Sequence, residues 1–271
     1  NYYIYFRIII INIKFNILKI LGSPNPFFNL KKLDVASINN SNRISKYGYV
    51  HLGNVLSNDK ILSIRKKIDN IVLSQKSNFN DKNLYHLIPN PLMIKEFFDL
   101  ACSPVFSNIA KAYFKREVYI SDVDSRRIPP VSLKQVEEKG LSSSNWHQDV
   151  RGRQVKLMVY LTDVDKNDSN FSFFPKTHLN NMPSNFKESR YNDNSFNSKS
   201  VEWYGKAGDA MMFDTNIIHR LRRSPKGRVR DSLTLYYTPG QYLNKIKIDS
   251  KFINKNKSLK IYDTPFWGKR A

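Results

Sequence analysis

The chain has 271 residues, of which 41% are hydrophobic and 13% aromatic, and this is enough to bury the core of one domain. A formal net charge of +21 would suit a nucleic-acid ligand, but the lysines are spread along the whole chain and define no binding face. The single cysteine, Cys102, excludes an intrachain disulfide framework and a multi-cysteine zinc site, which fits a cytoplasmic protein.

The first 22 residues are apolar, but three basic residues interrupt them, and the longest uncharged stretch runs only from Ile8 to Ile13. This is far below the roughly 20 residues that span a bilayer, so we expect no transmembrane segment. A helix packed on the domain, a disordered segment and an interfacial membrane helix stay open. We assign 1–43 to an N-terminal extension, helical or partly disordered, and 44–271 to a single domain.

Helical patterns dominate the first half of that domain. A Pro- and Asn-rich break at 23–42 precedes a short alternating strand at 47–52 and an amphipathic helix at 57–73. The apolar face of this helix consists of Ile61, Ile64, Ile68 and Val72. A second helical stretch covers 91–114 and is interrupted near Pro104, whose ring removes a backbone donor.

From Glu117 onward the chain reads as short β-rich runs separated by polar turns. The runs are 117–123, 155–164, 171–175, 200–205, 209–214 and 231–239. Two stretches without periodicity, 134–145 and 180–200, are predicted to be loops. Helices followed by strands indicate an α+β fold, mainly β, in which N-terminal helices back a sandwich, barrel or jelly-roll core.

A metal-binding pattern lies in this β region. His147 and Asp149 are two residues apart in SSSNWHQDVRG, so on extended backbone both side chains leave the same face. His219 closes the later run AGDAMMFDTNIIH. Two imidazoles and one carboxylate form the facial triad that binds non-haem Fe(II) and leaves positions open for other ligands. Alone, an H-x-D pair also arises by chance, and His219 would then be a core histidine.

The residues after His219 favour the metal site. Arg230 follows eleven residues later, at the opening of a strand in which Arg230, Ser232 and Thr234 share a face. A guanidinium group can bind the distal carboxylate of 2-oxoglutarate in a bidentate manner, and Ser232 or Thr234 could add a hydroxyl donor. The cosubstrate's 2-oxo group and adjacent carboxylate would then chelate the metal.

From about Ile44 to Pro239 the chain resembles the phytanoyl-CoA dioxygenase-like (PhyH) family. The motifs WHQD, VYLTDVD, FFPKTH and GDAMMFDTNIIH, with Arg230, fall in the family's order. The resemblance implies a double-stranded β-helix (jelly-roll, cupin-like) core, His147, Asp149 and His219 as iron ligands, Arg230 as cosubstrate anchor and Gln148 near the cosubstrate. It also implies hydroxylation rather than halogenation, because halogenating relatives lack the Asp149 carboxylate.

The middle strands depart from the family pattern. NDSNFSFFPKTH has no glycine where the family has its N-G-P and P-G-S-H turns, which puts the geometry of that loop in doubt. His178 is retained there, and we interpret it as structural because the triad is complete without it.

The predicted function is therefore an Fe(II)- and 2-oxoglutarate-dependent dioxygenase that uses dioxygen to hydroxylate a small metabolite and releases succinate and CO2. An anionic substrate held by Arg126, Arg151 and Arg153 is one hypothesis, and solvated arginines at strand ends are the alternative. A non-catalytic jelly-roll module that binds nucleic acid or acidic glycans would have no need for the triad. A metal-dependent isomerase or lyase would have no evident use for Arg230. The sequence predicts no nucleic-acid partner and leaves the oligomeric state open.

Overall fold

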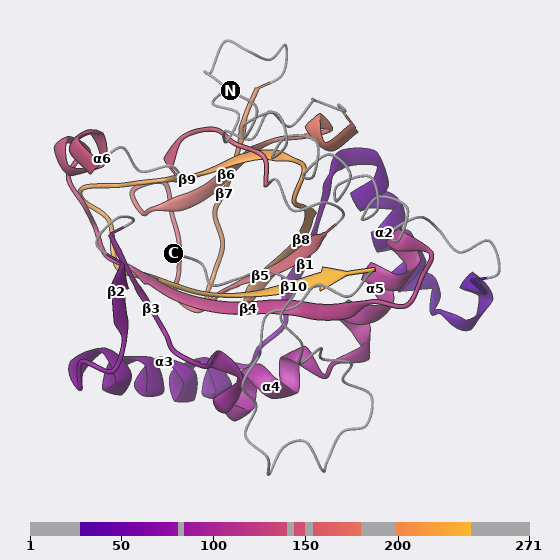
Figure 1. Cartoon of the computed structure of the whole chain (residues 1–271), viewed down its shortest axis with the longest axis horizontal. Helices are drawn as coiled ribbons and strands as arrows, with labels where there is room; N and C mark the ends of the chain where they lie inside the picture. The colour runs from indigo at the N-terminus through magenta and orange to yellow at the C-terminus, as the bar shows by residue number, and fades with distance from the viewer. Residues whose placement is uncertain (1–27, 81–83, 140–143, 150–153, 180–198, 240–271) are drawn as a thin grey trace, which may run out of the picture.

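Two antiparallel sheets form the two layers of a jelly roll (Figure 1). The computed structural model describes residues 28–80, 84–139, 144–149, 154–179 and 199–239, and every structural statement below concerns these residues. The larger sheet, in spatial order, contains β1 (Tyr49–Asn54), β8 (Asp209–Asp214), β5 (Val155–Tyr160), β10 (Arg230–Thr238), β4 (Tyr119–Ile128), β3 (Tyr85–Leu87) and β2 (Asn78–Asn80). The smaller sheet contains β7 (Val201–Trp203), β6 (Asn170–Phe174) and β9 (Ile218–Arg222). The predicted jelly-roll architecture is confirmed.

Helices α3 (Asn58–Leu73), α4 (Lys95–Ala101) and α5 (Pro104–Phe114) lie on one face of the larger sheet, and the smaller sheet lies on its other side (Figure 1). The helices are η1 (Leu30–Lys32), α2 (Val35–Tyr47), α3 (Asn58–Leu73), η2 (Pro91–Met93), α4 (Lys95–Ala101), α5 (Pro104–Phe114), α6 (Leu133–Lys139) and η4 (Thr177–Leu179). Helix α3 follows from its sequence, because its isoleucines recur at helical spacing and are buried. Within the described ranges, no helix combines the length and apolar character that crossing a membrane requires.

The strands of the larger sheet separate an apolar face from a more polar one. On β5, Val155, Leu157 and Val159 belong to the core cluster shared with the helices. The alternate side chains of β5 point to the opposite face, toward the smaller sheet, because successive side chains of a strand alternate. Met158 and Tyr160 pack there in a second, aromatic cluster with Phe171 of β6. Ser232 and Thr234 of β10 pair with Tyr160 and Met158, so this inner face also carries buried polar side chains.

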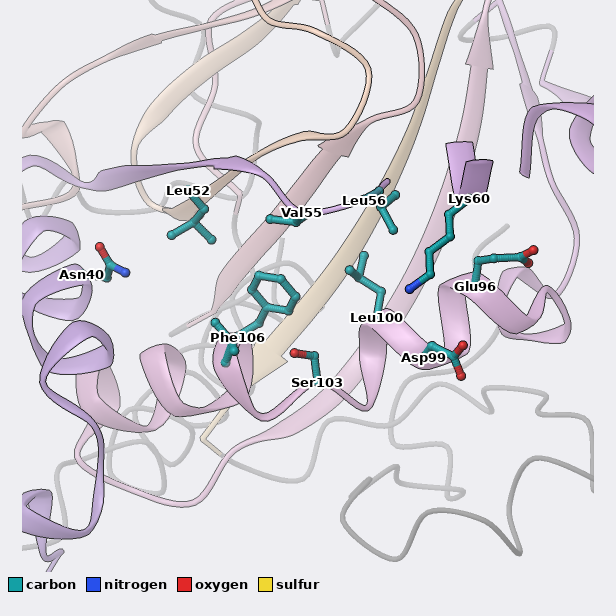
Figure 2. Close-up of a pocket in the computed structure, with 11 residues that line it drawn as sticks. Asn40, Leu52, Val55, Leu56, Lys60, Glu96, Asp99, Leu100, Ser103 and Phe106 are labelled. Atoms are coloured by element: carbon teal, nitrogen blue, oxygen red, sulfur yellow. The ribbon is translucent and has the colours of Figure 1, made fainter. Parts of the chain in front are cut away.

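A cleft of about 460 Å³ lies on the helical side of the molecule (Figure 2). Leu52, Leu56, Leu100 and Phe106 supply its apolar part, with Lys60 among its polar residues. Leu56, Leu100 and Phe106 belong to the helix-side core. The cleft is thus built from the helical layer and not from the inner face of the two sheets.

The structure corrects three sequence predictions. The Asn-rich segment predicted as a break contains α2, which packs on α5 and begins after Asp34, whose carboxylate accepts from the Ser37 amide at 2.7 Å. The predicted loop at 134–145 contains most of α6. The run that His219 was predicted to close is divided by a turn into β8 and β9, and His219 is the second residue of β9 and not the end of a strand. Helix α2 also crosses the predicted boundary between the extension at 1–43 and the domain at 44–271, and that division remains a prediction.

Gly208, in the turn before β8, has a φ of 97°, and a Cβ there would lie 3.0 Å from the Leu56 carbonyl oxygen and 2.5 Å from Asn54 Nδ2. We expect Gly208→Ala to lower the free energy of unfolding by about 2–5 kcal/mol, the sum of left-handed strain and overpacking. Gly53→Ala is the matched control, since Gly53 also has a positive φ, of 68°, but nothing lies within 4 Å of its Cβ position. Urea unfolding measures both variants, and equal losses would contradict the steric explanation.

Candidate metal and cosubstrate site

The turn between β8 and β9 holds the two parts of the candidate metal site together. His147 and His219 exchange backbone hydrogen bonds, with N–O distances of 3.0 and 2.9 Å. The Asp149 amide donates to the Thr215 carbonyl at 3.1 Å. These bonds fix the segment that carries the H-x-D pair against the first residues of β9, so ligands 72 residues apart in the chain become neighbours.

Hydrogen bonds to the side chain of Asp214 hold the turn in place. The buried Asp214 carboxylate accepts from the backbone and side-chain nitrogens of Asn216 at 2.7 and 2.8 Å, and from the Tyr113 hydroxyl at 2.5 Å. Gln148, between the two predicted ligands, donates from Nε2 to the Asn216 carbonyl at 2.5 Å. The helical layer, through Tyr113, thus supports the backbone that positions the site.

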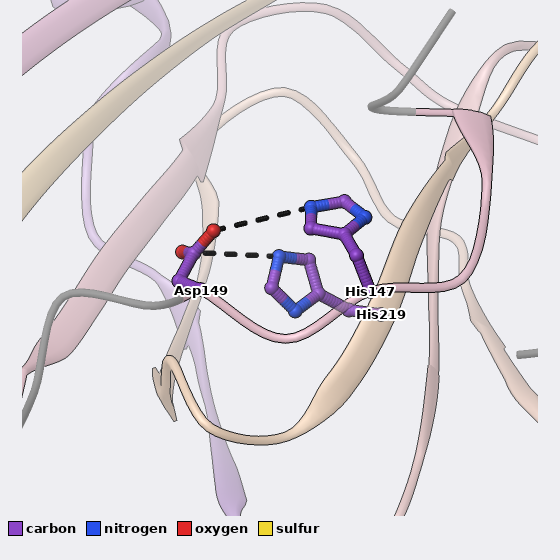
Figure 3. A group of neighbouring side chains, drawn as sticks. All are labelled: His147, Asp149 and His219. Atoms are coloured by element: carbon purple, nitrogen blue, oxygen red, sulfur yellow. Dashed lines mark ion pairs between the residues drawn. The ribbon is translucent and has the colours of Figure 1, made fainter. Parts of the chain in front are cut away.

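The three predicted metal ligands converge (Figure 3). One ligand atom from each of His147, Asp149 and His219 lies within 4.8 Å of the other two. Each histidine Nε2 is 3.9 Å from a carboxylate oxygen of Asp149, and the two imidazole centroids are 4.4 Å apart. This arrangement of two nitrogens and one oxygen on one side of a common point fits a divalent transition metal.

Backbone carbonyls fix the orientation of both imidazoles. Nδ1 of His147 is 2.8 Å from the Asn145 carbonyl oxygen, and Nδ1 of His219 is 2.7 Å from the Ile217 carbonyl oxygen. Because a carbonyl only accepts hydrogen bonds, Nδ1 must carry the proton in each ring. The lone pair is then on Nε2, the atom that faces Asp149, as metal coordination requires.

The electrostatics also suit metal binding. Burial, together with the charge of His147, lowers the pKa of His219 to about 3, so this imidazole is neutral at neutral pH. Burial alone would raise the pKa of Asp149, but the charge of the neighbouring Lys156 lowers it overall. Lys156, on the inner face of β5, forms an ion pair with the Asp149 carboxylate. The site therefore presents a neutral imidazole at His219 and an ionised carboxylate at Asp149.

Arg230 opens β10 and is only 4% exposed. Its side chain donates to the Ser169 carbonyl at 3.4 Å and lies 5.3 Å from the centroid of the Tyr160 ring. Its buried Nε has no hydrogen-bond partner among the described residues, and burial lowers its pKa. A buried guanidinium with an unused donor fits an anionic ligand, because such a donor is costly to leave unpaired.

The remaining predicted residues are placed as follows. Ser232 is buried on the face of β10 that carries Arg230, in register with Arg126 of β4. Arg126 pairs with Asp124 at 2.6 Å. His178 contacts the Ser45 carbonyl through Nε2 at 3.2 Å, outside the triad. Arg151 and Arg153 lie outside the described residues.

Two inward-facing side chains were missed as site residues. The inward orientation of Lys156 could be predicted from the alternation of β5, since Lys156 shares a face with Met158 and Tyr160. Its contact with Asp149 could not, because that contact depends on the fold. Arg223 follows β9 two residues after Leu221, and it is 5% exposed. Neither residue was predicted to belong to the metal or cosubstrate site, because their burial depends on contacts between distant strands.

Comparison with solved structures shows the same fold. The epimerase SnoN, in complex with Fe3+, alpha ketoglutarate and nogalamycin RO, has 16% sequence identity and a TM-score of 0.58, with 76% of this chain and 84% of that chain covered. The carbocyclase SnoK has 14% identity and a TM-score of 0.56 over 91% of this chain and 97% of its own. HygX from Streptomyces hygroscopicus, with nickel and 2-oxoglutarate bound, has 15% identity and a TM-score of 0.57 over 74% of this chain and 86% of its own.

At the level of sequence, no curated protein matches the chain significantly. The family model described as phytanoyl-CoA dioxygenase (PhyH) matches residues 44–228, which is more than half of the chain and includes the converging triad. The chain therefore belongs to the phytanoyl-CoA dioxygenase (PhyH) family.

Proposed function

We propose that the chain is an Fe(II)- and 2-oxoglutarate-dependent oxygenase that hydroxylates a small molecule. The observation that carries this proposal is the convergence of His147, Asp149 and His219, with both Nε2 atoms turned toward the carboxylate. Bound iron would supply the oxidation: dioxygen converts 2-oxoglutarate to succinate and CO2 and places its second oxygen atom in a substrate C–H bond. The structures of SnoN, with Fe3+ and alpha ketoglutarate, and of HygX, with nickel and 2-oxoglutarate, support this choice of metal and cosubstrate.

In this proposal the side chains of the protein bind the metal and the cosubstrate, orient them and shield them from water. The triad occupies one face of the metal and leaves the other positions for the cosubstrate and dioxygen. Arg230 anchors the distal carboxylate with Ser232 on the same face of β10, and Gln148, between the two metal ligands, lies at the metal end of the cosubstrate. Phe171 and Phe213, whose ring centroids lie 5.3 and 5.8 Å from that of His219, would shield one side of a bound metal from water.

Anaerobic reconstitution with Fe(II) and 2-oxoglutarate tests the proposal. The wild-type protein should develop a visible metal-to-ligand charge-transfer band, which requires a chelating 2-oxo acid on the metal. The His147→Ala variant should show no band. Polynucleotide binding with a steep salt dependence, without any band or succinate formation, would instead favour a non-catalytic binding module.

The type of oxidation is a separate part of the proposal. Relatives with this fold are named as an epimerase and a carbocyclase, so the same iron chemistry has more than one outcome. Mass spectrometry of the product separates them: hydroxylation adds one oxygen atom, ring closure removes two hydrogens, and epimerisation leaves the formula unchanged. We propose hydroxylation of a small, anionic metabolite, with Arg126, Arg151 and Arg153 as its predicted contacts, and a product without added oxygen would contradict hydroxylation.

A further inference from the structure

Lys156 lies on the inner face of β5 and is the most buried of the lysines that form ion pairs within the described part of the chain. Its side chain is 12% exposed, whereas the lysines of the other described ion pairs are between 25% and 83% exposed. Moving an ammonium group out of water is costly unless a partner compensates its charge. The contacts of Lys156 therefore indicate what this buried charge does.

The two neighbouring strands hold the lysine side chain in place. Its cross-strand neighbour is Tyr236 on β10 and Phe213 on β8. Nζ of Lys156 lies 4.7 Å from the Tyr236 ring centroid and 6.0 Å from that of Phe213, distances at which an aromatic ring attracts a cation. The Tyr236 ring is itself fixed, because its hydroxyl donates to the Asp124 carboxylate at 2.5 Å. These contacts limit the positions that the ammonium group can take.

The ammonium group contacts one particular oxygen of the candidate metal site. Both oxygens of Asp149 lie 3.9 Å from a histidine Nε2, Oδ1 from that of His147 and Oδ2 from that of His219 (Figure 3). Nζ of Lys156 donates to Oδ2, and no other carboxylate among the described residues pairs with it. A carboxylate can bind a metal through one oxygen or through both. The hydrogen bond to Oδ2 favours binding through Oδ1 alone.

We propose that Lys156 is a positioning residue that restricts Asp149 to a single bond with the metal, through Oδ1. The triad then leaves positions for both donor atoms of the 2-oxo acid and for dioxygen, and a second bond from Asp149 would remove one of these positions. The positive charge of Lys156 acts in the same direction, because it opposes the metal cation and favours the anionic 2-oxo acid. The inference rests on the proposed function and adds a residue that controls coordination at its metal site.

The test compares Lys156→Met with Lys67→Met, which removes the ion pair with Glu96 at 2.6 Å in the helical layer. Calorimetric titration measures the Kd of Mn(II). Anaerobic titration of the Fe(II) proteins, followed by the charge-transfer band, measures the Kd of 2-oxoglutarate and of 2-oxopentanoate, which has the same chain length but no distal carboxylate for Arg230 to bind.

Lys156→Met should raise the Kd of both 2-oxo acids by about 10- to 100-fold, the range typical of partners in the outer shell of a metal. Its Kd for Mn(II) should not rise, because the second oxygen of Asp149 becomes available and a nearby cation is removed. Lys67→Met should change none of the three values. Opposite responses of the metal and the 2-oxo acids are the sign of a positioning role, since structural damage weakens the binding of both.

The outcomes also distinguish this inference from the proposed function. Wild-type protein that forms no complex with either 2-oxo acid would overturn the proposed function itself. Three results would overturn only the role of Lys156: unchanged Kd values for both acids, a rise for 2-oxoglutarate alone, or a rise for Mn(II) together with both acids. If Lys156→Met does not fold, Lys156→Gln removes the charge but keeps a polar end in this buried position, and the same changes are expected.

Discussion

Replacing His219 with alanine should abolish metal binding and all 2-oxoglutarate turnover. Partners in the outer shell of a metal typically contribute about 10- to 100-fold to affinity, so the loss of a direct ligand should exceed about 100-fold. His219 supplies one of the three converging ligand atoms, and its Nδ1 is already bound to a backbone carbonyl, so no other atom of the ring can replace Nε2. Calorimetric titration with Mn(II) and a succinate assay measure the two effects.

The fold of this variant should survive, which keeps the experiment interpretable. Burial lowers the pKa of His219 to about 3, so the side chain is neutral at neutral pH and its removal leaves no buried charge uncompensated. His51→Ala is the histidine control, because His51 is exposed on the edge strand β1 and lies outside the triad. Retention of normal Mn(II) affinity in His219→Ala would contradict the assigned metal site, whereas equal losses in both variants would point to unfolding.

Much of the fold was predictable because local patterns and tertiary packing agree. Ile61, Ile64 and Ile68 repeat at helical spacing and are buried in α3 as expected. The strands β8 and β10 are nearly continuous buried runs, and such runs are recognisable from composition. The metal ligands were predictable for a different reason: the H-x-D spacing and the later histidine carry chemical information that does not depend on knowing the strand order.

The missed elements have identifiable physical causes. Asparagines in α2 have low helix propensity, and its stability comes from packing on α5, which no local pattern reveals. In contrast, the start of α6 has a recognisable sequence pattern. The Ser132 hydroxyl accepts from the backbone N–H of Gln135 at 3.2 Å, and the side-chain oxygen of Gln135 accepts from the backbone N–H of Ser132 at 3.0 Å. This reciprocal capping box is visible as S-x-x-Q in the sequence.

The inner face of the site was less predictable than its ligands. Lys156 and Arg223 lie 67 residues apart in the sequence, and strand alternation indicates only that each could face inward. Which face of a strand is inward depends on the smaller sheet, and the sequence did not predict β9 as a strand separate from β8. The site residues that belong to a sequence motif could therefore be predicted. The residues whose role depends on neighbouring strands could be identified only from the structure.

Replacing Arg230 with methionine should remove cosubstrate binding without weakening the cosubstrate-free protein. Arg230 is buried, its Nε lacks a hydrogen-bond partner among the described residues, and burial lowers its pKa. An apolar side chain of similar length avoids that desolvation penalty, so the metal-loaded variant should melt at the wild-type temperature or above it. Two charge-assisted bonds of about 1.5 kcal/mol each correspond to a loss of more than about 100-fold in 2-oxoglutarate affinity.

Thermal shift separates these two effects in one experiment. At 100 times its Kd, 2-oxoglutarate should stabilise the wild-type holoprotein by about 2.7 kcal/mol, and the same concentration should give almost no stabilisation of Arg230→Met. The control is Arg228→Met, since Arg228 lies two residues earlier, is half-exposed and is already paired with Asp165 and Asp168. That variant should lose some stability but keep the full 2-oxoglutarate shift. A full shift in Arg230→Met would show that the distal carboxylate binds elsewhere, because stabilisation by a ligand follows its affinity for the folded state alone.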